Sequence, residues 1–300
     1  TLMPTTTSST ITPKLTRRAL ALGLMAIGFS SVVTPTMADT TWPTKPLSLM
    51  VGFPPGGQTD FAARVLTNSL AASLGQGVVI ENKAGVNGNL GSLDIMRSAP
   101  DGYRLLVGNG SMTVTPHVFP TLGIADPTKF VPIGVLLKSP LVLVVPASSP
   151  VKNFEQFVAL VKDRAKSGKT VDYATPGAGS LVHVTTELLR ERIGGPAMNQ
   201  VPYKGSGPAV IDLMAGRVEA MFDATSVFDP YIKSGKVRPI LVTSSTRAAS
   251  LPDVPTPAEV GLKDFEIISF IGMYGPPGTP AAVVKKMNAT INTVLKEPAV

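Results

Sequence analysis

The sequence predicts an α/β fold of two domains with a ligand cleft between them. Short apolar runs alternate along the chain with stretches whose apolar residues recur at helical spacing, a pattern typical of parallel strands joined by crossover helices. The pattern occurs twice, before and after a middle section of extended, proline-punctuated segments. In each half a glycine-rich loop follows a strand and precedes a helix. We expect these loops, one set from each domain, to face each other across the cleft.

The first half contains three predicted strands and two predicted helices. Its apolar runs place strands at residues 47–51, 78–81 and 105–107, and its helical spacing places helices at residues 61–74 and 89–97. Strands that alternate with helices in this way pair in parallel, because each helix carries the chain back to the edge where the previous strand began.

Two extended segments, residues 131–137 and 141–145, are expected to lead from the first domain into the second. The second half then repeats the order of the first. Its predicted strands are residues 171–174, 199–201, 219–223 and 239–242, and its predicted helices are residues 154–161, a segment through 188–189, residues 208–214 and residues 228–232.

An extended run at residues 267–274 is expected to return to the first domain, which a helix at residues 280–295 completes. These elements predict that residues 39–143 and 269–300 form domain 1 and that residues 144–268 form domain 2.

The first 38 residues have the features of a signal peptide. The cations Lys14, Arg17 and Arg18 precede an apolar run at residues 19–33, no acidic residue occurs in the segment, and the small residues that end at Ala38 suit a signal peptidase. We therefore expect cleavage near Ala38 and a periplasmic mature protein. The adjacent arginines also fit twin-arginine export, but such pairs are common in ordinary signal peptides, so we favour the general export route.

The composition argues against several classes of function. The chain has no cysteine, which excludes thiol catalysis and cysteine-ligated metals, and two isolated histidines make a metal site unexpected. The net charge is +7, and removal of the three cations of the signal peptide leaves +4. Lys and Arg form no cluster, so we expect no binding of nucleic acid. No Gly-x-Gly-x-x-Gly motif follows a strand, and we expect no cofactor.

The motifs of common enzymes are incomplete. The Gly-x-Ser-x-Gly of a nucleophile elbow does not occur, and a phosphate loop that would end at residues 168–170 has Asp163 in place of its first glycine. Ser180 and His183 lie one helical turn apart, but neither His183 nor His117 has an obvious acidic partner. We therefore expect no catalytic residue.

The loop at residues 53–60 is the main candidate for a ligand site. It joins the first strand to a helix through Phe53, two prolines, Gly56 and Gly57. The first N–H groups of a helix lack an internal partner and carry partial positive charge, and glycine lets an anion approach them. The loop therefore predicts a site for an anion, most simply a carboxylate, with Asp60 closing the loop by accepting backbone N–H bonds. The alternative is a βα turn that holds no ligand.

Three polar residues of the second half allow two interpretations each. Lys204 contacts the ligand or is a solvated turn residue. His183 contacts the ligand or packs against its own helix. Asp223, at the end of an apolar strand, holds a polar part of the ligand or accepts backbone N–H bonds within its own domain.

Eight short segments occur in a characteristic order from Trp42 to the end of the chain. They are Trp42-Pro43-Thr44-Lys45-Pro46, Phe53-Pro54-Pro55-Gly56-Gly57 with Thr59 and Asp60, Val79-Ile80-Glu81-Asn82, Pro100-Asp101-Gly102-Tyr103, Val201-Pro202-Tyr203-Lys204-Gly205, Met221-Phe222-Asp223, Leu251-Pro252-Asp253-Val254-Pro255-Thr256 and Gly275-Pro276-Pro277-Gly278-Thr279-Pro280. The ordered set resembles the Bug family of extracytoplasmic solute-binding proteins, the receptors associated with tripartite tricarboxylate transporters.

The resemblance implies a two-domain, periplasmic-binding-protein-like (type II-like) fold that closes on a small carboxylate. It also implies a set of ligand-binding residues from both domains. These are Phe53, Gly56, Gly57, Thr59, Asp60, Asn109, Ser111, Thr175, Gly179, Ser180, His183, Lys204, Gly205 and Asp223.

We therefore expect a monomeric binding protein, not an enzyme. It would capture a small organic carboxylate, such as a di- or tricarboxylate or an aromatic acid, and deliver it to the subunits of a membrane transporter. The alternative is a hydrolase or lyase of small acids on a two-domain α/β fold, which turnover of a bound acid would reveal. Members of the family usually continue past Glu297 and Pro298 into a further helix, whereas this sequence runs from Thr1 to Val300, a difference typical of a fragment.

Overall fold

The fold is seen in a computed structural model, which describes residues 42–195, 198–298 and 300. The predicted signal peptide and its cleavage site lie outside the described residues. Residues 42–300 form one compact unit. None of the helices in the described ranges is long and apolar enough to cross a membrane.

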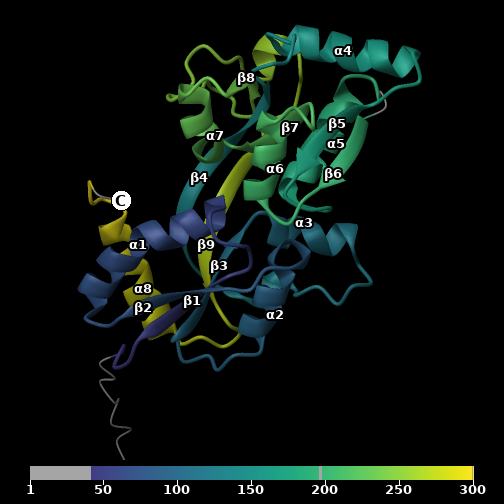
Figure 1. Cartoon of the computed structure of the whole chain (residues 1–300). Coiled ribbons are helices and arrows are strands. Elements are labelled where there is room, and N and C mark those ends of the chain that lie inside the picture. Colours follow the sequence, from purple (N-terminus) through teal and green to yellow (C-terminus); the bar gives the residue numbers. More distant parts are fainter. Residues whose placement is uncertain (1–41, 196–197, 299) are drawn as a thin grey trace, which may run out of the picture. The chain divides into compact units, whose positions relative to one another are not determined.

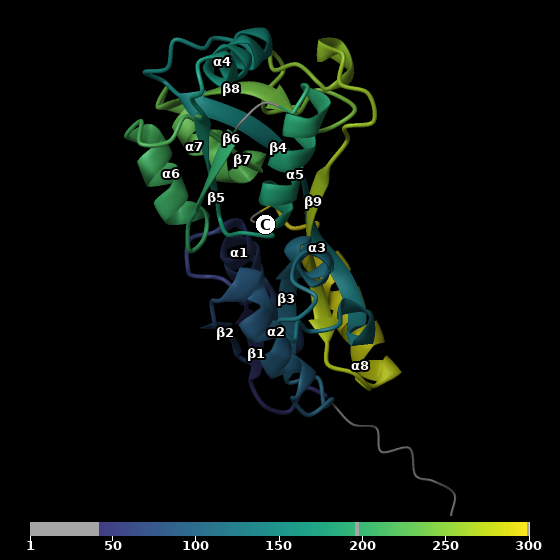
Figure 2. The same ribbon diagram turned by 90° about the vertical axis from the view of Figure 1, so that its right-hand side faces the viewer.

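The described strands form one mixed sheet in two regions (Figures 1 and 2). In the first region β1 (Leu47–Val51) pairs in parallel with both β2 (Val78–Asn82) and β3 (Arg104–Asn109). The parallel pairing of the three predicted strands is thus confirmed. The strand β9 (Ile268–Gly275) then pairs antiparallel with β3 and with the long strand β4 (Val131–Pro146).

The second sheet region begins where β4 changes its partners. Residues 131–140 of β4 pair with β9, whereas residues 141–146 pair with β7 (Ala220–Ala224) and β8 (Val237–Val242). The strand β5 (Val171–Thr175) pairs in parallel with β7 and with β6 (Met198–Pro202). The two extended segments predicted at residues 131–137 and 141–145 are therefore one continuous strand.

Helices cover both faces of each sheet region. In the first region α1 (Gln58–Leu74) and α8 (Ala281–Val294) pack on one face, and α2 (Asn89–Met96) packs on the other beside α3 (Ser111–Val118). In the second region α4 (Phe154–Lys166) and α5 (Leu181–Arg192) cover one face, and α6 (Ser206–Met214) and α7 (Thr225–Lys233) cover the other. We call the first sheet region with α1–α3 and α8 the first lobe, and the second region with α4–α7 the second lobe.

Each lobe thus has its own apolar core, which lies between its sheet and its helices. The chain passes between the lobes within β4 and again just before β9. Because β4 is continuous through both lobes, the domain boundaries at 143/144 and 268/269 stay a prediction.

Candidate functional site

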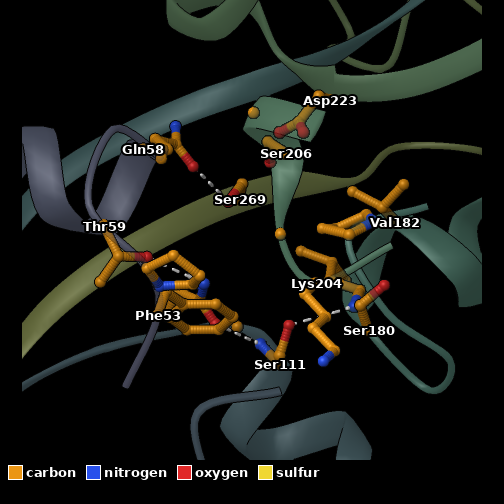
Figure 3. Close-up of a pocket in the computed structure, with 18 of the residues that line it drawn as sticks. Phe53, Gln58, Thr59, Ser111, Ser180, Val182, Lys204, Ser206, Asp223 and Ser269 are labelled. Carbon is orange, nitrogen blue, oxygen red and sulfur yellow. Dashed lines mark hydrogen bonds between the residues drawn. The ribbon is translucent and has the colours of Figure 1, made fainter. Parts of the chain in front are cut away.

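A cavity of about 70 Å³, which we call the site cavity, lies where loops of the two lobes meet (Figure 3). First-lobe residues of its lining come from the loop after β1, the starts of α1 and α3, the end of β3 and the strand β9. Second-lobe residues come from the loops after β5 and β6, from the starts of α5 and α6, and from the strands β4 and β7. These loops meet because each follows the carboxyl end of a parallel strand, and parallel strands end at the same edge of their sheet.

Four helix N-termini reach this cavity. Its lining includes first-turn residues of α1 (Gln58, Thr59), α3 (Ser111), α5 (Leu181, Val182) and α6 (Ser206, Gly207, Pro208). The N-cap residues of α1, α3 and α6 are glycines, which have no side chain to cap these helices, and in α3 the first N–H is accepted by Asn109 Oδ1. The first-turn N–H groups of α1 and α6 and the positive ends of the four helix dipoles favour an anion at this place.

The loop at residues 53–60, which we call the first loop, depends on two different properties of glycine. Gly56 has a φ of 87°, which side chains rarely adopt, whereas Gly57 has an extended conformation with a φ of −87° and a ψ of 171°. Gly52 lies so close to the backbone of Gly88 that a Cβ there would come within 2.5 Å of its Cα atom. This approach holds the start of the loop against the neighbouring segment and sets the position of Phe53, which lines the cavity.

Asp60 stabilises the first loop through hydrogen bonds to its buried carboxylate. The residue is 2 % exposed, and its carboxylate accepts hydrogen bonds from Gly56 N (2.9 Å), Arg64 Nε (2.8 Å) and Asn82 Nδ2 (2.9 Å). Burial raises the pKa of Asp60, but the hydrogen bonds from Arg64, Gly56 and Asn82 outweigh it and lower the pKa below its usual value. The predicted backbone N–H bond to Asp60 is thus confirmed.

We expect Asp60→Ala to lower the free energy of unfolding by about 1–3 kcal/mol at pH 7 and to weaken ligand binding in part, because Gly56 loses its acceptor. Denaturant titration of both proteins at pH 7 and in acid measures the effect. A carboxylate whose pKa is lowered in the folded state stabilises the fold above its unfolded pKa of about 3.9, and this stabilisation disappears as the pH falls through the folded pKa. The difference between the proteins should therefore shrink in acid. An equal loss for the exposed Asp163→Ala would argue against this role.

Hydrogen bonds from α3 and its flanks connect the lobes around the cavity. Leu181 N donates to Ser111 Oγ (3.3 Å), and Thr115 Oγ1 donates to Gly179 O (3.3 Å). Within the first lobe, Asn109 Nδ2 donates to Thr59 Oγ1 (3.0 Å), while its Oδ1 accepts the N–H of Ser111 (3.0 Å). Asn109 therefore joins the first turns of α1 and α3.

Two more hydrogen bonds cross between the lobes. Asn87 Nδ2 donates to Ala178 O (2.6 Å), and Gln58 Nε2 contacts Ser226 Oγ (3.4 Å). The structure therefore shows the lobes in contact around the cavity, which is the arrangement expected of a cleft that has closed.

The second lobe presents a cation, a helix cap and a buried acid. Lys204 is exposed and lines the cavity together with Gly205, the N-cap residue of α6, whose φ is 109°. Ser180 caps α5 by accepting the N–H of His183 (3.2 Å). His183 Nδ1 in turn accepts the N–H of Gly179 (3.0 Å), so this nitrogen is not available to take a proton from Ser180.

Asp223 lies at the carboxyl end of β7 and is 5 % exposed. Its Oδ1 accepts the N–H of Ala224 (2.8 Å), and its Oδ2 has no hydrogen-bond partner among the described residues. Burial raises the pKa of Asp223 to about 6, against a smaller lowering by Ser206 and the N–H of Ala224. Figure 3 shows Asp223 and Ser206 together, and Phe53, Ser111 and Lys204 in another part of the lining.

The structure brings nine of the fourteen predicted ligand residues together in the cavity lining. They are Phe53, Gly57, Thr59, Asn109, Ser111, Ser180, Lys204, Gly205 and Asp223. The other five, Gly56, Asp60, Thr175, Gly179 and His183, are not in the lining. Asp60 and His183 bond to backbone N–H groups of their own loops, and Thr175 is fully buried and accepts a hydrogen bond from Gln200 Nε2 (2.8 Å).

Three polar lining residues were missed from the sequence. They are Gln58, Ser206 and Ser269. Gln58 and Ser206 directly follow the N-cap glycines of α1 and α6, so the rule that selected Gly57 and Gly205 also leads to them. Ser269 lies within β9, and no local pattern marks it.

A second, larger cavity of about 570 Å³ adjoins the first. It shares Phe53, Pro54, Pro176, Lys204 and Gly205 with the site cavity. Its further lining includes Phe119, Leu122 and Tyr203, so that apolar surface continues beyond the polar site.

Comparison with known proteins agrees with this fold. Residues 62–300 match the model of the tripartite tricarboxylate transporter family receptor. The chain is 36 % identical over 288 residues to the protein BugT of Bordetella pertussis, which covers 95 % of this chain and 86 % of BugT.

Solved structures are similar over the same region. MatC of Rhodopseudomonas palustris with bound malate is 32 % identical, with a TM-score of 0.80 over 86 % of this chain and 87 % of MatC. The R. palustris protein Rpa4515 with adipate is 33 % identical, with a TM-score of 0.81 over 86 % of this chain and 85 % of the other. The periplasmic binding protein BugD is 35 % identical, with a TM-score of 0.78 over 86 % of this chain and 85 % of BugD. This chain therefore has the two-domain fold of periplasmic binding proteins, and it belongs to the tripartite tricarboxylate transporter receptor family.

Proposed function

We propose that this protein is a periplasmic receptor that captures a small organic carboxylate between its lobes and delivers it to a tripartite tricarboxylate-type membrane transporter. In this role it binds its ligand without chemical change. The observation that carries the proposal is the convergence of four helix N-termini on one cavity whose lining also includes Lys204. This arrangement suits a carboxylate group. The malate and adipate found with the two similar proteins are both carboxylates.

The number of hydrogen-bond donors around the cavity supports this proposal. Micromolar affinity needs about −8 kcal/mol, and association itself costs at least about 4 kcal/mol in lost motion. A hydrogen bond to a charged group contributes roughly 1.5–3 kcal/mol, so about four to six such bonds suffice. The first turns of α1 and α6, Lys204 and the hydroxyl of Ser111 offer this many donors. The adjoining larger cavity has room for the remainder of a longer or aromatic acid.

The proposal is tested by a thermal-shift screen of the purified protein against di- and tricarboxylates, aromatic acids and acidic amino acids. A ligand at one hundred times its Kd adds about 2.7 kcal/mol, which corresponds to a rise in Tm of about 5–10 °C for a protein of this size. The amide analogue of each acid, such as succinamide for succinate, is the matched control and should shift the Tm much less. If no carboxylate raises the Tm of a well-folded sample, the receptor function is wrong.

Recovery of the ligand after binding tests the absence of turnover, and a chemically changed product would instead support a hydrolase or lyase. Delivery to a transporter is tested in cells that carry the cognate membrane subunits. Uptake of the labelled acid should depend on this protein, and it should be lost when the protein is absent from the periplasm.

A further inference from the structure

The carboxylate of Asp223 is the polar group in the site cavity that the structure leaves least satisfied. It lies on a strand, β7, whose five residues are all buried, and it is 5 % exposed. Only one of its oxygens, Oδ1, has a hydrogen-bond partner among the described residues, the N–H of Ala224. A buried carboxylate oxygen without a partner is costly, and such groups are rare in folded proteins. The position therefore calls for a functional explanation.

The unpartnered oxygen belongs to the site cavity. Asp223 is part of the lining, and with Lys204 it makes up the charged side chains of that lining in the described chain. The rest of the lining favours an anion, because it contains Lys204 and the N-termini of α1, α3, α5 and α6. A ligand that fills this cavity thus meets donors along most of the wall and one acid at β7.

An ionised carboxylate can only accept hydrogen bonds. The pKa of Asp223 is raised to about 6 by burial, so the group is mostly ionised above neutral pH. In that state it repels a carboxylate of the ligand and attracts a group that brings its own proton. The hydroxyl of Ser206 lies beside Asp223 in the cavity lining (Figure 3), but it forms no hydrogen bond with Oδ2.

We infer that Asp223 selects carboxylates that also carry a hydrogen-bond donor, a hydroxyl or an ammonium group, which binds its Oδ2 atom. This inference rests on the proposed carboxylate-binding function and names the class of ligand. The carboxylate of the ligand lies at the helix N-termini and Lys204, and the donor group lies at β7. Hydroxy acids and amino acids therefore bind more tightly than the plain acids of the same carbon skeleton.

The test compares matched triples of acids with the wild-type protein by isothermal titration calorimetry at pH 7.5. The triples are succinate, malate and aspartate; glutarate, 2-hydroxyglutarate and glutamate; and 3-phenylpropionate, 3-phenyllactate and phenylalanine. In the triple whose skeleton fits, we expect a donor-bearing member to bind at least about tenfold more tightly than the plain acid. The hydroxy and amino arms show which of the two donors the site takes.

Asp223→Asn then assigns the preference to this side chain. The variant keeps the size of the residue and removes its charge, so the advantage of the donor-bearing acid over the plain acid should fall by about tenfold. Asp163→Asn is the matched control, because Asp163 is an exposed residue of α4, pairs with Lys166 and is absent from the lining. The Tm of each variant shows that it is folded, and the wild-type comparison needs no variant at all.

Each outcome decides between defined alternatives. Plain acids that bind as tightly as their hydroxy and amino analogues overturn this inference and leave the carboxylate receptor standing. A donor preference that persists in Asp223→Asn also overturns it. If no acid of the panel or of the thermal-shift screen binds to the folded protein, both the inference and the proposed function are wrong.

Discussion

Gly57→Val is expected to abolish carboxylate binding and to leave the protein folded. Gly57 lines the site cavity at the N-terminus of α1, and a Cβ built on it meets no atom within 4 Å. The valine side chain therefore extends into empty space beside the first N–H groups of the helix, where the carboxylate of the ligand should lie. Loss of two charge-assisted hydrogen bonds costs about 3–6 kcal/mol, which raises the Kd by two to four orders of magnitude.

The fold should tolerate this change because Gly57 has an extended conformation, with a φ of −87° and a ψ of 171°, which valine adopts readily. The strained position of the loop is its neighbour Gly56, with a φ of 87°. Calorimetry measures the Kd, and thermal melting without ligand measures stability. Gly57→Ala is the graded control, with a smaller loss of affinity. An unchanged Kd for Gly57→Val would remove the first loop from the anion site.

Regular elements with strong apolar patterns could be predicted from the sequence. The strands at residues 47–51 and 171–174 and the helix at residues 61–74 correspond to β1, β5 and α1, with ends that differ by at most three residues. Their apolar residues recur at the period of the element, and glycine-rich turns separate them.

Two features of the fold could not be predicted in this way. Pro140 divides the apolar runs of β4, and a proline usually ends a strand, because it has no N–H to donate. Here it lies where β4 exchanges β9 for β7 and β8, so the sheet loses little. The helix α3 was missed because it is short, contains Pro116 and buries only Ser111 and Thr115, neither of which is apolar.

The site could be predicted as a set of loops, but the directions of its side chains could not. Glycine-rich loops at the carboxyl ends of parallel strands must gather at one edge, and so Gly57, Asn109 and Lys204 all line the cavity. Whether a polar residue of such a loop faces the ligand or its own backbone depends on local hydrogen bonds. His183 is an example, since its Nδ1 accepts the N–H of Gly179.

Gly110→Val is expected to weaken ligand binding by opposing closure of the lobes. Gly110 caps α3 in the first lobe with right-handed helical angles, so valine causes no backbone strain there. In the closed arrangement, however, a Cβ at this position comes within 3.0 Å of Leu181 Cδ2 in the second lobe. Two further methyl groups overpack this contact, at a cost of about 1–3 kcal/mol, which corresponds to a 5- to 150-fold higher Kd.

Small-angle scattering separates this effect from damage to the anion site. The wild-type radius of gyration should fall at saturating ligand, because the lobes close around it. Gly110→Val should keep the Tm of the free protein but show a smaller fall, since the obstacle exists only when α3 meets the start of α5. Adding Leu181→Ala removes the side chain that valine strikes, and the double variant should recover most of the lost affinity. If Gly110→Val alone binds as tightly as the wild type, binding does not require the lobe contact seen between Gly110 and Leu181. If the wild-type radius of gyration does not change with ligand, the lobes do not close on binding and this explanation is wrong.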